Sequence, residues 1–339
     1  MLCASVPELA EATISSLPPH LSHDPENNSK RSDPFQFGSR LLSETDNVYE
    51  FNAWDHVETD DTYKEYAEEQ YAKQREAPVS DFDKSRFNSD PAKWWNNFYK
   101  NNTSNFFKDR KWLQQEFPIL TEITKPDAGH VTLLEVGAGA GNTAFPILSR
   151  NHNPNLKIHA CDFSKKAVEV IRANEAYDTK NVQADVWDAA GDELPPGLAE
   201  GSVDYALMIF IFSALSPSQW KQTVDNIYKL LKPGGEVLFR DYGRGDLAQV
   251  RFKKGRYLEE NFYIRGDGTR VYFFEKDELI DIWTKNTVDD APSEASPVPC
   301  FQVVDLGVDR RLLVNRAKQL KMYRCWLQGR FRKEGEKPV

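Results

Sequence analysis

Three glycines follow a short apolar run in the segment LLEVGAGAGN, residues 133–142. The run Val131–Val136 predicts a β-strand, and Gly137, Gly139 and Gly141 follow it directly before a predicted helix. A strand that enters a helix through a glycine-rich turn lets a ligand approach backbone N–H groups closely. The segment therefore predicts a ligand site at the end of a buried strand, within a strand–turn–helix unit.

Strands and helices alternate on both sides of this turn. The predicted strands are nearly continuous apolar runs, which is typical of a parallel sheet that is covered on both faces. They are Val131–Val136, Leu156–Cys161, Val182–Val186, Val203–Phe212 and Glu236–Arg240. The predicted helices between them are Asn142–Arg150, Ser164–Asn174 and Ser216–Leu231. This alternation predicts an α/β fold with a doubly wound, mostly parallel sheet, and Phe301–Leu306 and Met322–Leu327 predict an antiparallel pair that brings it to seven strands.

Composition divides the chain into five expected parts. Residues 1–45 are rich in Ser, Pro, Asn and Asp and are expected to form a disordered or extended arm. Residues 46–130 are expected to form a helical, aromatic cap, and residues 131–243 the α/β core. Residues 244–270 interrupt the alternation as a basic insertion, and residues 271–339 supply the last strands and a basic C-terminal end.

Charge is distributed unevenly along the chain. The formal net charge is −9, yet residues 307–339 contain ten Lys or Arg and three Asp or Glu. A basic end on an acidic protein favours a polyanionic partner, although a solvated tail would explain it equally well.

The cysteines and the apolar runs exclude several classes of protein. Cys3, Cys161, Cys300 and Cys325 show no C-x-x-C spacing, so neither a metal site nor a disulfide framework is predicted. No run of about 18 apolar residues predicts a transmembrane helix. The first residues are more acidic than a transit peptide and lack the apolar segment of a signal peptide. We expect a cytoplasmic protein.

The spacing of the glycines distinguishes two classes of cofactor. The dinucleotide fingerprint requires G-x-G-x-x-G or G-x-G-x-x-A, and Asn142 occupies the sixth position here. The pattern G-x-G-x-G preceded by an acid, Glu135, instead resembles motif I of the class I methyltransferases, which use S-adenosylmethionine (AdoMet). A tight turn without any ligand would also account for the glycines.

Two acids end the next two predicted strands. Asp162 lies 21 residues beyond Gly141, where a carboxylate can accept both ribose hydroxyls. Asp185 ends the third strand, where methyltransferases place an acid against the adenine amine. A local cap would explain either Asp alone, but three such features at the ends of consecutive strands favour one cofactor site. Phe163 and Ile209 are further candidates for contacts with the cofactor.

Longer motifs resemble one known family. The stretches DPFQFGSRLL, FNAWDHVE, NFFKDRKW, IFIFSALSP, LFRDYG and ENFYIRGDGTR are similar to the eukaryotic tRNA N3-methylcytidine methyltransferases, from about Asp33 to Phe331. The resemblance implies a Rossmann-like class I fold, AdoMet as the cofactor, and methylation of cytidine 32 in the anticodon loop of a tRNA. FNAWDHVE most resembles the branch that acts on threonine tRNAs. A protein partner, such as an aminoacyl-tRNA synthetase, is a further expectation, because members of the family differ in needing one.

The chemistry of this reaction requires few catalytic groups. Cytosine N3 is neutral at pH 7 and carries an in-plane lone pair, so it can attack a sulfonium methyl in line without a general base. A carboxylate near the ring would stabilise the cationic product, and Asp241 is the candidate. Tyr242 is a candidate for stacking on the flipped cytosine, and Arg240 for holding a phosphate or the base carbonyl. A turn capped by Asp241 is the structural alternative.

The segment NFFKDRKW combines aromatic and charged residues just before the glycine turn. Phe106 and Trp112 are candidates for packing over the cofactor and excluding water. Lys108 and Arg110 are candidates for binding the carboxylate of the cofactor or tRNA phosphates. The alternative is an amphipathic helix that buries its aromatic residues in the core.

Two groups of basic residues are candidates for RNA contacts, because a loop nucleotide is recognised by stacking and by its phosphates. The first group, in the insertion, is Arg251, Lys253, Lys254, Arg256, Arg265 and Arg270. The second group, near the C-terminus, is Arg310, Arg311, Arg316, Lys318, Lys321 and Arg324.

Three other functions stay open at this point. A methyltransferase for a protein or a small molecule would share the fold without needing the basic groups. A non-catalytic AdoMet-binding or RNA-binding protein is disfavoured by the presence of Asp162, Asp185 and the RDYG segment. A nicotinamide-dependent oxidoreductase is disfavoured by Asn142.

Overall fold

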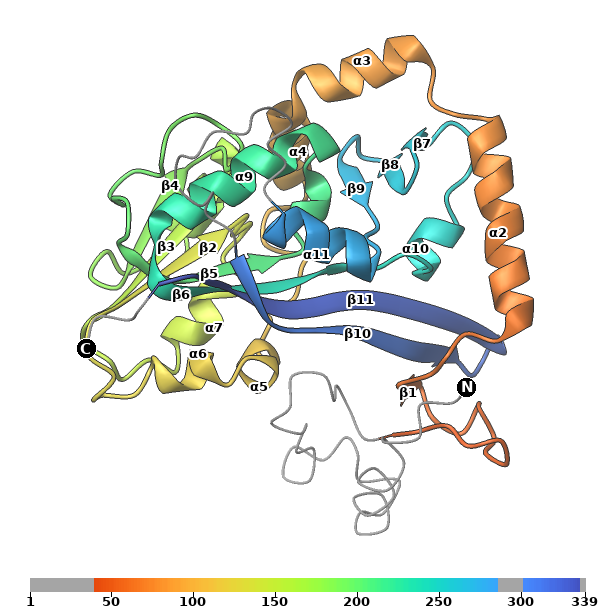
Figure 1. Cartoon of the computed structure of the whole chain (residues 1–339), viewed down its shortest axis with the longest axis horizontal. Helices are drawn as coiled ribbons and strands as arrows, with labels where there is room; N and C mark the ends of the chain where they lie inside the picture. Colours follow the sequence, from red (N-terminus) through yellow and green to blue (C-terminus); the bar gives the residue numbers. More distant parts are fainter. Residues whose placement is uncertain (1–39, 286–300, 336–339) are drawn as a thin grey trace, which may run out of the picture.

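The computed structural model describes residues 40–285 and 301–335 (Figure 1). Most of the arm predicted over residues 1–45 lies outside the described residues, as do Cys3 and Cys300. The described end of that region is packed onto the fold, since Arg40 is buried and its guanidinium lies 3.8 Å from the centre of the Phe51 ring. The backbone N–H of Arg40 also donates to the Asp55 carboxylate at 3.3 Å.

An eight-stranded sheet forms the centre of the fold, in the order β1-β10-β11-β6-β5-β2-β3-β4. The five strands from β6 to β4 pair in parallel, and β11, β10 and β1 extend the β6 edge in antiparallel. The strands are β1 (Ala53–Asp55), β2 (Val131–Val136), β3 (Leu156–Asp162), β4 (Val182–Val186), β5 (Val203–Ile209), β6 (Leu231–Tyr242), β10 (Phe301–Asn315) and β11 (Leu320–Lys333). The mostly parallel α/β sheet is confirmed, but the count of seven strands is wrong by one, because β1 pairs with the outer edge of β10.

Helices cover both faces of the parallel part of this sheet (Figure 1). On one face lie α9 (Pro217–Leu230) and α11 (Lys276–Thr284). On the other lie α5 (Leu113–Glu116), α6 (Ile119–Glu122) and α7 (Ala144–Leu148), and α8 (Lys165–Arg172) connects β3 to β4. The doubly wound arrangement therefore brings the carboxyl ends of β2, β3, β5 and β6 to one edge of the molecule.

One strand ends earlier in the structure than the sequence predicts. The apolar run from Val203 predicts a strand to Phe212, but β5 ends at Ile209. Phe210 has a φ of 58°, in the left-handed region, and this breaks the extended chain. The 3₁₀ helix η2 (Phe212–Ala214) follows.

Side-chain caps determine where the helices begin. The Asp90 carboxylate accepts the Lys93 backbone N–H at 3.0 Å, and Pro91 lies in the first turn, so α4 (Pro91–Asn102) begins where the sequence predicts. At the start of α8, the Ser164 hydroxyl accepts the Ala167 N–H at 3.2 Å. These polar groups satisfy N–H groups that the helices themselves leave unpaired.

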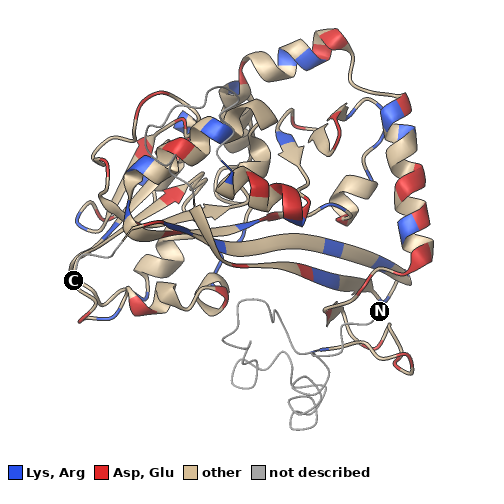
Figure 2. Ribbon diagram, viewed as in Figure 1, with Lys and Arg blue, Asp and Glu red and all other residues tan. Residues whose placement is uncertain are grey.

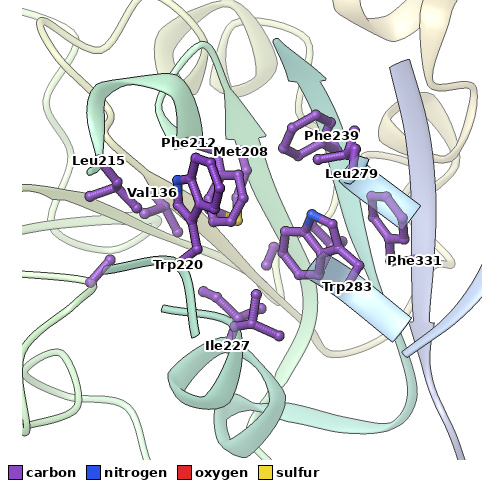
Figure 3. Packing of buried hydrophobic residues seen from close by; sticks show 14 of the residues in the cluster. Val136, Met208, Phe212, Leu215, Trp220, Ile227, Phe239, Leu279, Trp283 and Phe331 are labelled. Atoms are coloured by element: carbon purple, nitrogen blue, oxygen red, sulfur yellow. The ribbon is translucent and has the colours of Figure 1, made fainter. Parts of the chain in front are cut away.

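The core lies on both faces of the sheet, and β6 contributes to each. Phe239 packs with Phe212, Trp283 and Phe331 on the face covered by α9 and α11 (Figure 3). Leu238, the preceding residue, belongs to the cluster on the opposite face. The alternation follows from the pleat of a strand, and each buried Phe contributes about 1.5–3 kcal/mol relative to exposure.

The cap and the insertion surround the edge where the parallel strands end (Figure 1). The cap contains α2 (Asp61–Glu76), α3 (Asp81–Ser89) and α4. The insertion contains α10 (Leu247–Val250) and a separate three-stranded sheet of β7 (Tyr257–Glu259), β8 (Phe262–Ile264) and β9 (Arg270–Tyr272). This small sheet continues two residues beyond the boundary expected at residue 270.

Over residues 40–285 and 301–335, no helix combines the length and the apolar character needed to cross a membrane.

Candidate active site

A cavity of about 620 Å³ opens where the parallel strands end. From the core it is lined by six of the predicted cofactor residues: Gly137, Gly139, Asn142, Asp162, Phe163 and Ile209. Tyr242, at the end of β6, also lines it, and so do the cap and the insertion. Its volume is in the range of cofactor and small-molecule sites, and it runs without interruption from the glycine turn to the insertion.

The glycine turn leaves no room for side chains. Gly139 has a φ of 60°, and a Cβ there would lie 2.5 Å from the Tyr99 hydroxyl oxygen. At Gly137, with a φ of 69°, a Cβ would lie 2.4 Å from the Ile211 side chain. Backbone angle and space therefore both require glycine. Gly141 does not line the cavity, because its own tight contact is with Phe145 in α7.

Asp162 connects the second parallel strand to this turn. Its Oδ2 atom accepts the Gly139 N–H and its Oδ1 atom accepts the Ser164 N–H, both at 2.8 Å. Burial raises the pKa of Asp162 to about 6, against the effect of these two hydrogen bonds. Each carboxylate oxygen keeps a further lone pair, so the group can still accept a ligand hydroxyl from the cavity side.

Glu135 lies behind the turn, at the end of β2. Its carboxylate is fully buried, and neither oxygen has a hydrogen-bond partner among the described residues. Burial raises its pKa to about 7, and the guanidinium of Arg110, 3.9 Å away, the Thr143 hydroxyl and the Ala144 backbone N–H oppose that rise. Arg110, Thr143 and Ala144 therefore partly offset the cost of burying this acid.

The aromatic segment before β2 is fastened to the glycine turn. The Arg110 backbone N–H donates to the Asn142 carbonyl at 2.8 Å, and the Asn142 amide donates to the Phe107 carbonyl at 3.3 Å. Of the residues predicted there, Phe106, Lys108, Arg110 and Trp112 all line the cavity. The segment forms a cap over the turn rather than one amphipathic helix, although Phe117, just beyond it, is buried in the core.

Asp185 does not reach the cavity. Its carboxylate accepts from Arg172 Nη2 at 2.9 Å and from Gln183 Nε2 at 2.7 Å, because it lies one residue before the end of β4 and faces α8. The residues that line the cavity beside it are Trp187, Asp188 and Ala189, which follow the strand. The predicted contact between Asp185 and adenine is therefore not supported. The acid that lines the cavity after β4 is Asp188.

Only one of the three predicted catalytic residues reaches the cavity. Tyr242 does, whereas Arg240 and Asp241 point to opposite faces of β6 and are both buried. Asp241 accepts the backbone N–H groups of Ser213 at 2.9 Å and of Tyr242 at 2.8 Å, and burial raises its pKa to about 6. It holds a turn, which was the structural alternative.

Arg240 is part of a buried polar network. It donates to Gln328 Oε1 at 2.7 Å and to Asp309 Oδ2 at 2.5 Å, and its guanidinium lies between the rings of Trp112 and Trp326, 5.2 and 5.0 Å from their centres. The predicted contact between Arg240 and a phosphate or a base is therefore not supported.

Known proteins similar to this chain share one activity in their names. A family model described as "Methyltransferase domain" matches residues 134–237. The chain is 54% identical over 300 residues to the tRNA(Thr) (cytosine(32)-N(3))-methyltransferase of Saccharomyces cerevisiae, covering 88% of this chain and 46% of that protein. It is 50% identical over 297 residues to the tRNA N(3)-methylcytidine methyltransferase trm140 of Schizosaccharomyces pombe, covering 88% of this chain and 92% of that protein.

This chain belongs to the tRNA N3-methylcytidine methyltransferase family. A third relative, the tRNA N(3)-methylcytidine methyltransferase Mettl2 of Drosophila melanogaster, is 42% identical over 310 residues. The match covers 91% of this chain and 91% of that protein. The chain spans slightly less than half the length of the S. cerevisiae relative. The resemblance inferred from the sequence motifs is confirmed.

In this methyltransferase family member, the six basic residues of the insertion lie in three different settings. Arg251, Arg265 and Arg270 line the cavity, whereas Lys253 and Lys254 are exposed beside it. Arg270 is buried and donates to the amide oxygens of Asn88 and Gln219, and burial lowers its pKa to about 10. Arg256 donates to the Arg265 carbonyl. The guanidinium groups of Arg256 and Arg270 therefore make hydrogen bonds within the protein.

The basic C-terminal end of the methyltransferase is not a solvated tail, because its described part forms the β10–β11 hairpin (Figure 2). Arg311 pairs with Asp309 at 3.0 Å, and Arg310 lies 3.7 Å from Glu58. Arg316 donates to the Glu50 carbonyl at 2.9 Å. Lys318 and Lys321 are exposed near the tip, and Arg324 lines the cavity while pairing with Asp246 at 2.8 Å. Arg311 therefore has charged partners within the protein, Asp309 and Asp55.

Three of the cavity residues that sequence reasoning missed matter most for the site. Tyr99 lies on α4 with its hydroxyl over Gly139, and Asp188 and Phe210 lie in the turns after β4 and β5. The helical spacing of Trp95 and Tyr99 was a signal for the first of these, since residues four apart share a helix face. No sequence pattern distinguishes Asp188 from Asp185 or marks the turn at Phe210. In the described part of the chain, no three His, Cys, Asp or Glu side chains come together as metal ligands.

Proposed function

We propose that this protein transfers a methyl group from AdoMet to N3 of cytidine 32 in the anticodon loop of threonine tRNAs. The observation that carries the proposal is the single cavity that joins the glycine turn to Tyr242 and the arginines of the insertion. The substrate is inferred from the names of the relatives, one of which specifies tRNA(Thr) and cytosine 32. A methyltransferase for proteins or small molecules would not need a cavity edged by basic residues.

The residues at the turn suit AdoMet. Asp162 can accept the ribose hydroxyls, and Trp187 and Asp188 can hold the adenine. Lys108 and Arg110 line the cavity and can pair with the carboxylate of the methionine part, and Glu135, buried behind the turn, offers a countercharge for its ammonium group. Gly137 and Gly139 line the cavity directly, so the backbone of the turn can lie against such a ligand. When bound, AdoMet supplies an electrophilic sulfonium methyl group.

The residues on the other side of the cavity place the nucleophile. Cytosine N3 needs no proton removed, so these side chains have to position the base and exclude water instead of acting as a base. Tyr242 offers an aromatic face, and Arg265, whose guanidinium lies 5.6 Å from the centre of the Tyr242 ring, offers donors for the base carbonyl or a phosphate. Asp241 acts through the backbone: it fixes the N–H groups of Ser213 and Tyr242 and thereby orients the Tyr242 ring.

The parts of the chain have separate roles in this proposal. Residues 46–130 cover the cofactor, residues 131–243 bind it, and residues 244–270 contact the tRNA with Arg251, Lys253 and Lys254. The exposed lysines attract the anticodon stem-loop through its phosphates, and the cavity selects an unstacked base. A cytoplasmic location and a protein partner such as a synthetase are finer proposals that rest on the resemblance of the sequence motifs.

Mass spectrometry of nucleosides from individually purified tRNAs tests the function. Incubation with the purified protein and AdoMet is expected to produce 3-methylcytidine in threonine tRNAs that lack it. Substitution of cytidine 32 by uridine should abolish the product, because uracil N3 carries a proton. Methyl transfer that resists nuclease digestion of the product, or no transfer to any tRNA, would contradict the proposal.

A further inference from the structure

Phe210 has a backbone conformation that a bulky residue rarely adopts. Its φ is 58°. Among the described residues, only four other non-glycine residues have a positive φ: His56, Thr103, Asn261 and Gln319. Left-handed angles crowd the Cβ atom against the following carbonyl oxygen, so a large aromatic residue is unfavourable there. Strained residues of this kind gather at functional sites.

The surrounding structure keeps this turn in place. The Phe210 backbone N–H donates to the Arg240 carbonyl at 2.8 Å, and the Asp241 carboxylate accepts the Ser213 N–H at 2.9 Å. Both contacts come from the end of β6. The last residues of one strand therefore hold the turn that follows its neighbour, and a glycine would satisfy the same backbone without strain.

The strained turn places the Phe210 ring in the cavity. The ring centre lies 5.0 Å from that of Tyr242, with 46° between the planes. The Arg110 guanidinium lies 5.9 Å from the Phe210 ring, on the side of the cofactor residues. Tyr242 in turn lies 5.7 Å from Phe273 of the insertion. The two rings therefore lie at the junction between the two halves of the cavity.

A pair of aromatic rings at this junction suits a base that becomes cationic. Stacking on an aromatic side chain stabilises a bound base by about 1–3 kcal/mol. Methylation at N3 places a positive charge on the cytosine ring, and aromatic faces attract cations. The attraction grows as the charge develops, so an interaction of this kind accelerates the reaction more than it strengthens binding.

We infer that Phe210, together with Tyr242, forms the platform on which the target base stacks during methyl transfer. The inference rests on the proposed function and deepens it, because it assigns a base-stacking role to a residue of the IFIFSALSP motif for which the sequence predicts only a place in a strand. The backbone strain at residue 210 serves to direct the ring to the junction.

Four substitutions separate the ring from the backbone: Phe210→Tyr, Phe210→Leu, Phe210→Ala and Phe210→Gly. With purified protein and a threonine tRNA transcript, the single-turnover rate at saturating tRNA should fall about 10- to 100-fold for Leu, Ala and Gly, the range that corresponds to loss of one stacking contact. Phe210→Tyr keeps the ring and should stay within about threefold of the wild type. AdoMet affinity should change less than about twofold in all four, as the dissociation constants from calorimetric titration will show.

The Gly and Ala variants test whether the effect is merely structural. Phe210→Gly should melt at a higher temperature than Phe210→Ala, because glycine accepts the positive φ. The two should nevertheless show equally low rates, since both lack the ring. Phe82→Leu, at an exposed position on α3 far from the cavity lining, is the matched aromatic control and should keep the wild-type rate.

The outcomes distinguish this inference from the proposed function. A rate for Phe210→Leu within about twofold of the wild type, or a rate for Phe210→Gly that recovers with its melting temperature, overturns the stacking role and leaves the function standing. A wild-type protein that forms no 3-methylcytidine in any tRNA overturns both.

Discussion

Arg240 and Asp309 form an ion pair inside the sheet, with Arg240 Nη2 2.5 Å from Asp309 Oδ2 and both side chains no more than 5% exposed. The pair joins β6 to β10 across the intervening strand β11. Burial acts to raise the pKa of Asp309, but Arg240 and Arg311 outweigh it and hold the pKa below its usual value. Arg240 therefore serves the fold, although Tyr242, two residues further along the chain, lines the cavity.

Removal of one partner of this pair should destabilise the fold. Arg240→Met leaves the Asp309 carboxylate buried and less well paired, which typically costs about 3–5 kcal/mol. The double variant Arg240→Met with Asp309→Leu should recover much of the loss, since no uncompensated carboxylate remains. Urea denaturation followed by circular dichroism measures both. A single variant that unfolds like the wild type yet loses activity would restore the catalytic role predicted for Arg240.

The glycine turn should not tolerate alanine at Gly139. The new Cβ would meet the Tyr99 hydroxyl oxygen at 2.5 Å, and the turn would hold alanine at an unfavourable φ of 60°, so AdoMet affinity measured by calorimetry should fall at least about tenfold. Tyr99→Phe in the same chain removes the nearest atom and should restore part of the affinity. Gly129→Ala is the control: its φ is 73° with nothing within 4 Å, so stability should fall by about 1 kcal/mol without a change in affinity. Equal losses of affinity in both would contradict the role of the turn.

Replacement of Glu135 by Gln should raise the stability of the protein at pH 8 and weaken its binding of AdoMet. Its pKa is raised from 4.5 to about 7 by burial, so the folded state binds its proton more tightly than the unfolded chain does. Stability from this group is therefore present below about pH 4.5 and is lost as the pH rises towards 7. At pH 8, Glu135→Gln should be more stable than the wild type by about 2 kcal/mol and should melt at a higher temperature. At pH 4 the two proteins should melt at similar temperatures.

The same variant should bind AdoMet more weakly at pH 8, because the countercharge for its ammonium group is gone. Calorimetric titration alongside the thermal melts measures this. An unchanged affinity would show that Glu135 serves the fold alone, and an unchanged melting temperature at pH 8 would show that its carboxylate is satisfied.

Two neighbouring acids should behave differently when neutralised. Asp188→Asn changes a residue of the cavity and should weaken AdoMet binding about tenfold, through lost contacts with the adenine. Asp185→Asn removes only a partly exposed ion pair with Arg172, which contributes at most about 1 kcal/mol to stability, and should leave AdoMet affinity unchanged. Calorimetry on both variants decides between them, and the reverse order would reinstate Asp185.

Lys253 and Lys254 should account for part of the salt dependence of tRNA binding. Replacement of both by Gln should lower the slope of log K against log salt by about 1.5–2, because each phosphate contact releases counterions. Lys157 and Lys180 are the matched control, since they lie at or before the amino ends of β3 and β4, away from the cavity. Filter-binding titrations at several salt concentrations measure the slopes. An unchanged slope in the first pair would remove these lysines from the interface.

Some elements of this protein follow from local sequence alone. The β2 and β4 bounds agree with the predicted runs, and α4 begins at Pro91 with Asp90 as its cap. Apolar runs, caps and glycine turns act over a few residues, so a single sequence contains them in full. The same reasoning placed the cofactor turn at Gly137 and Gly139 and the cap segment beside it.

Only the tertiary structure decided which side chains at the strand ends reach the cavity. Arg240, Asp241 and Tyr242 are consecutive, yet the first pairs across the sheet, the second caps a turn and the third faces the cavity. Successive residues of a strand point to opposite faces, and the partner that each one meets comes from a strand or helix distant in sequence. The ring of Phe210 depends on a hydrogen bond from its backbone to β6, thirty residues further along the chain, and no local pattern encodes that contact.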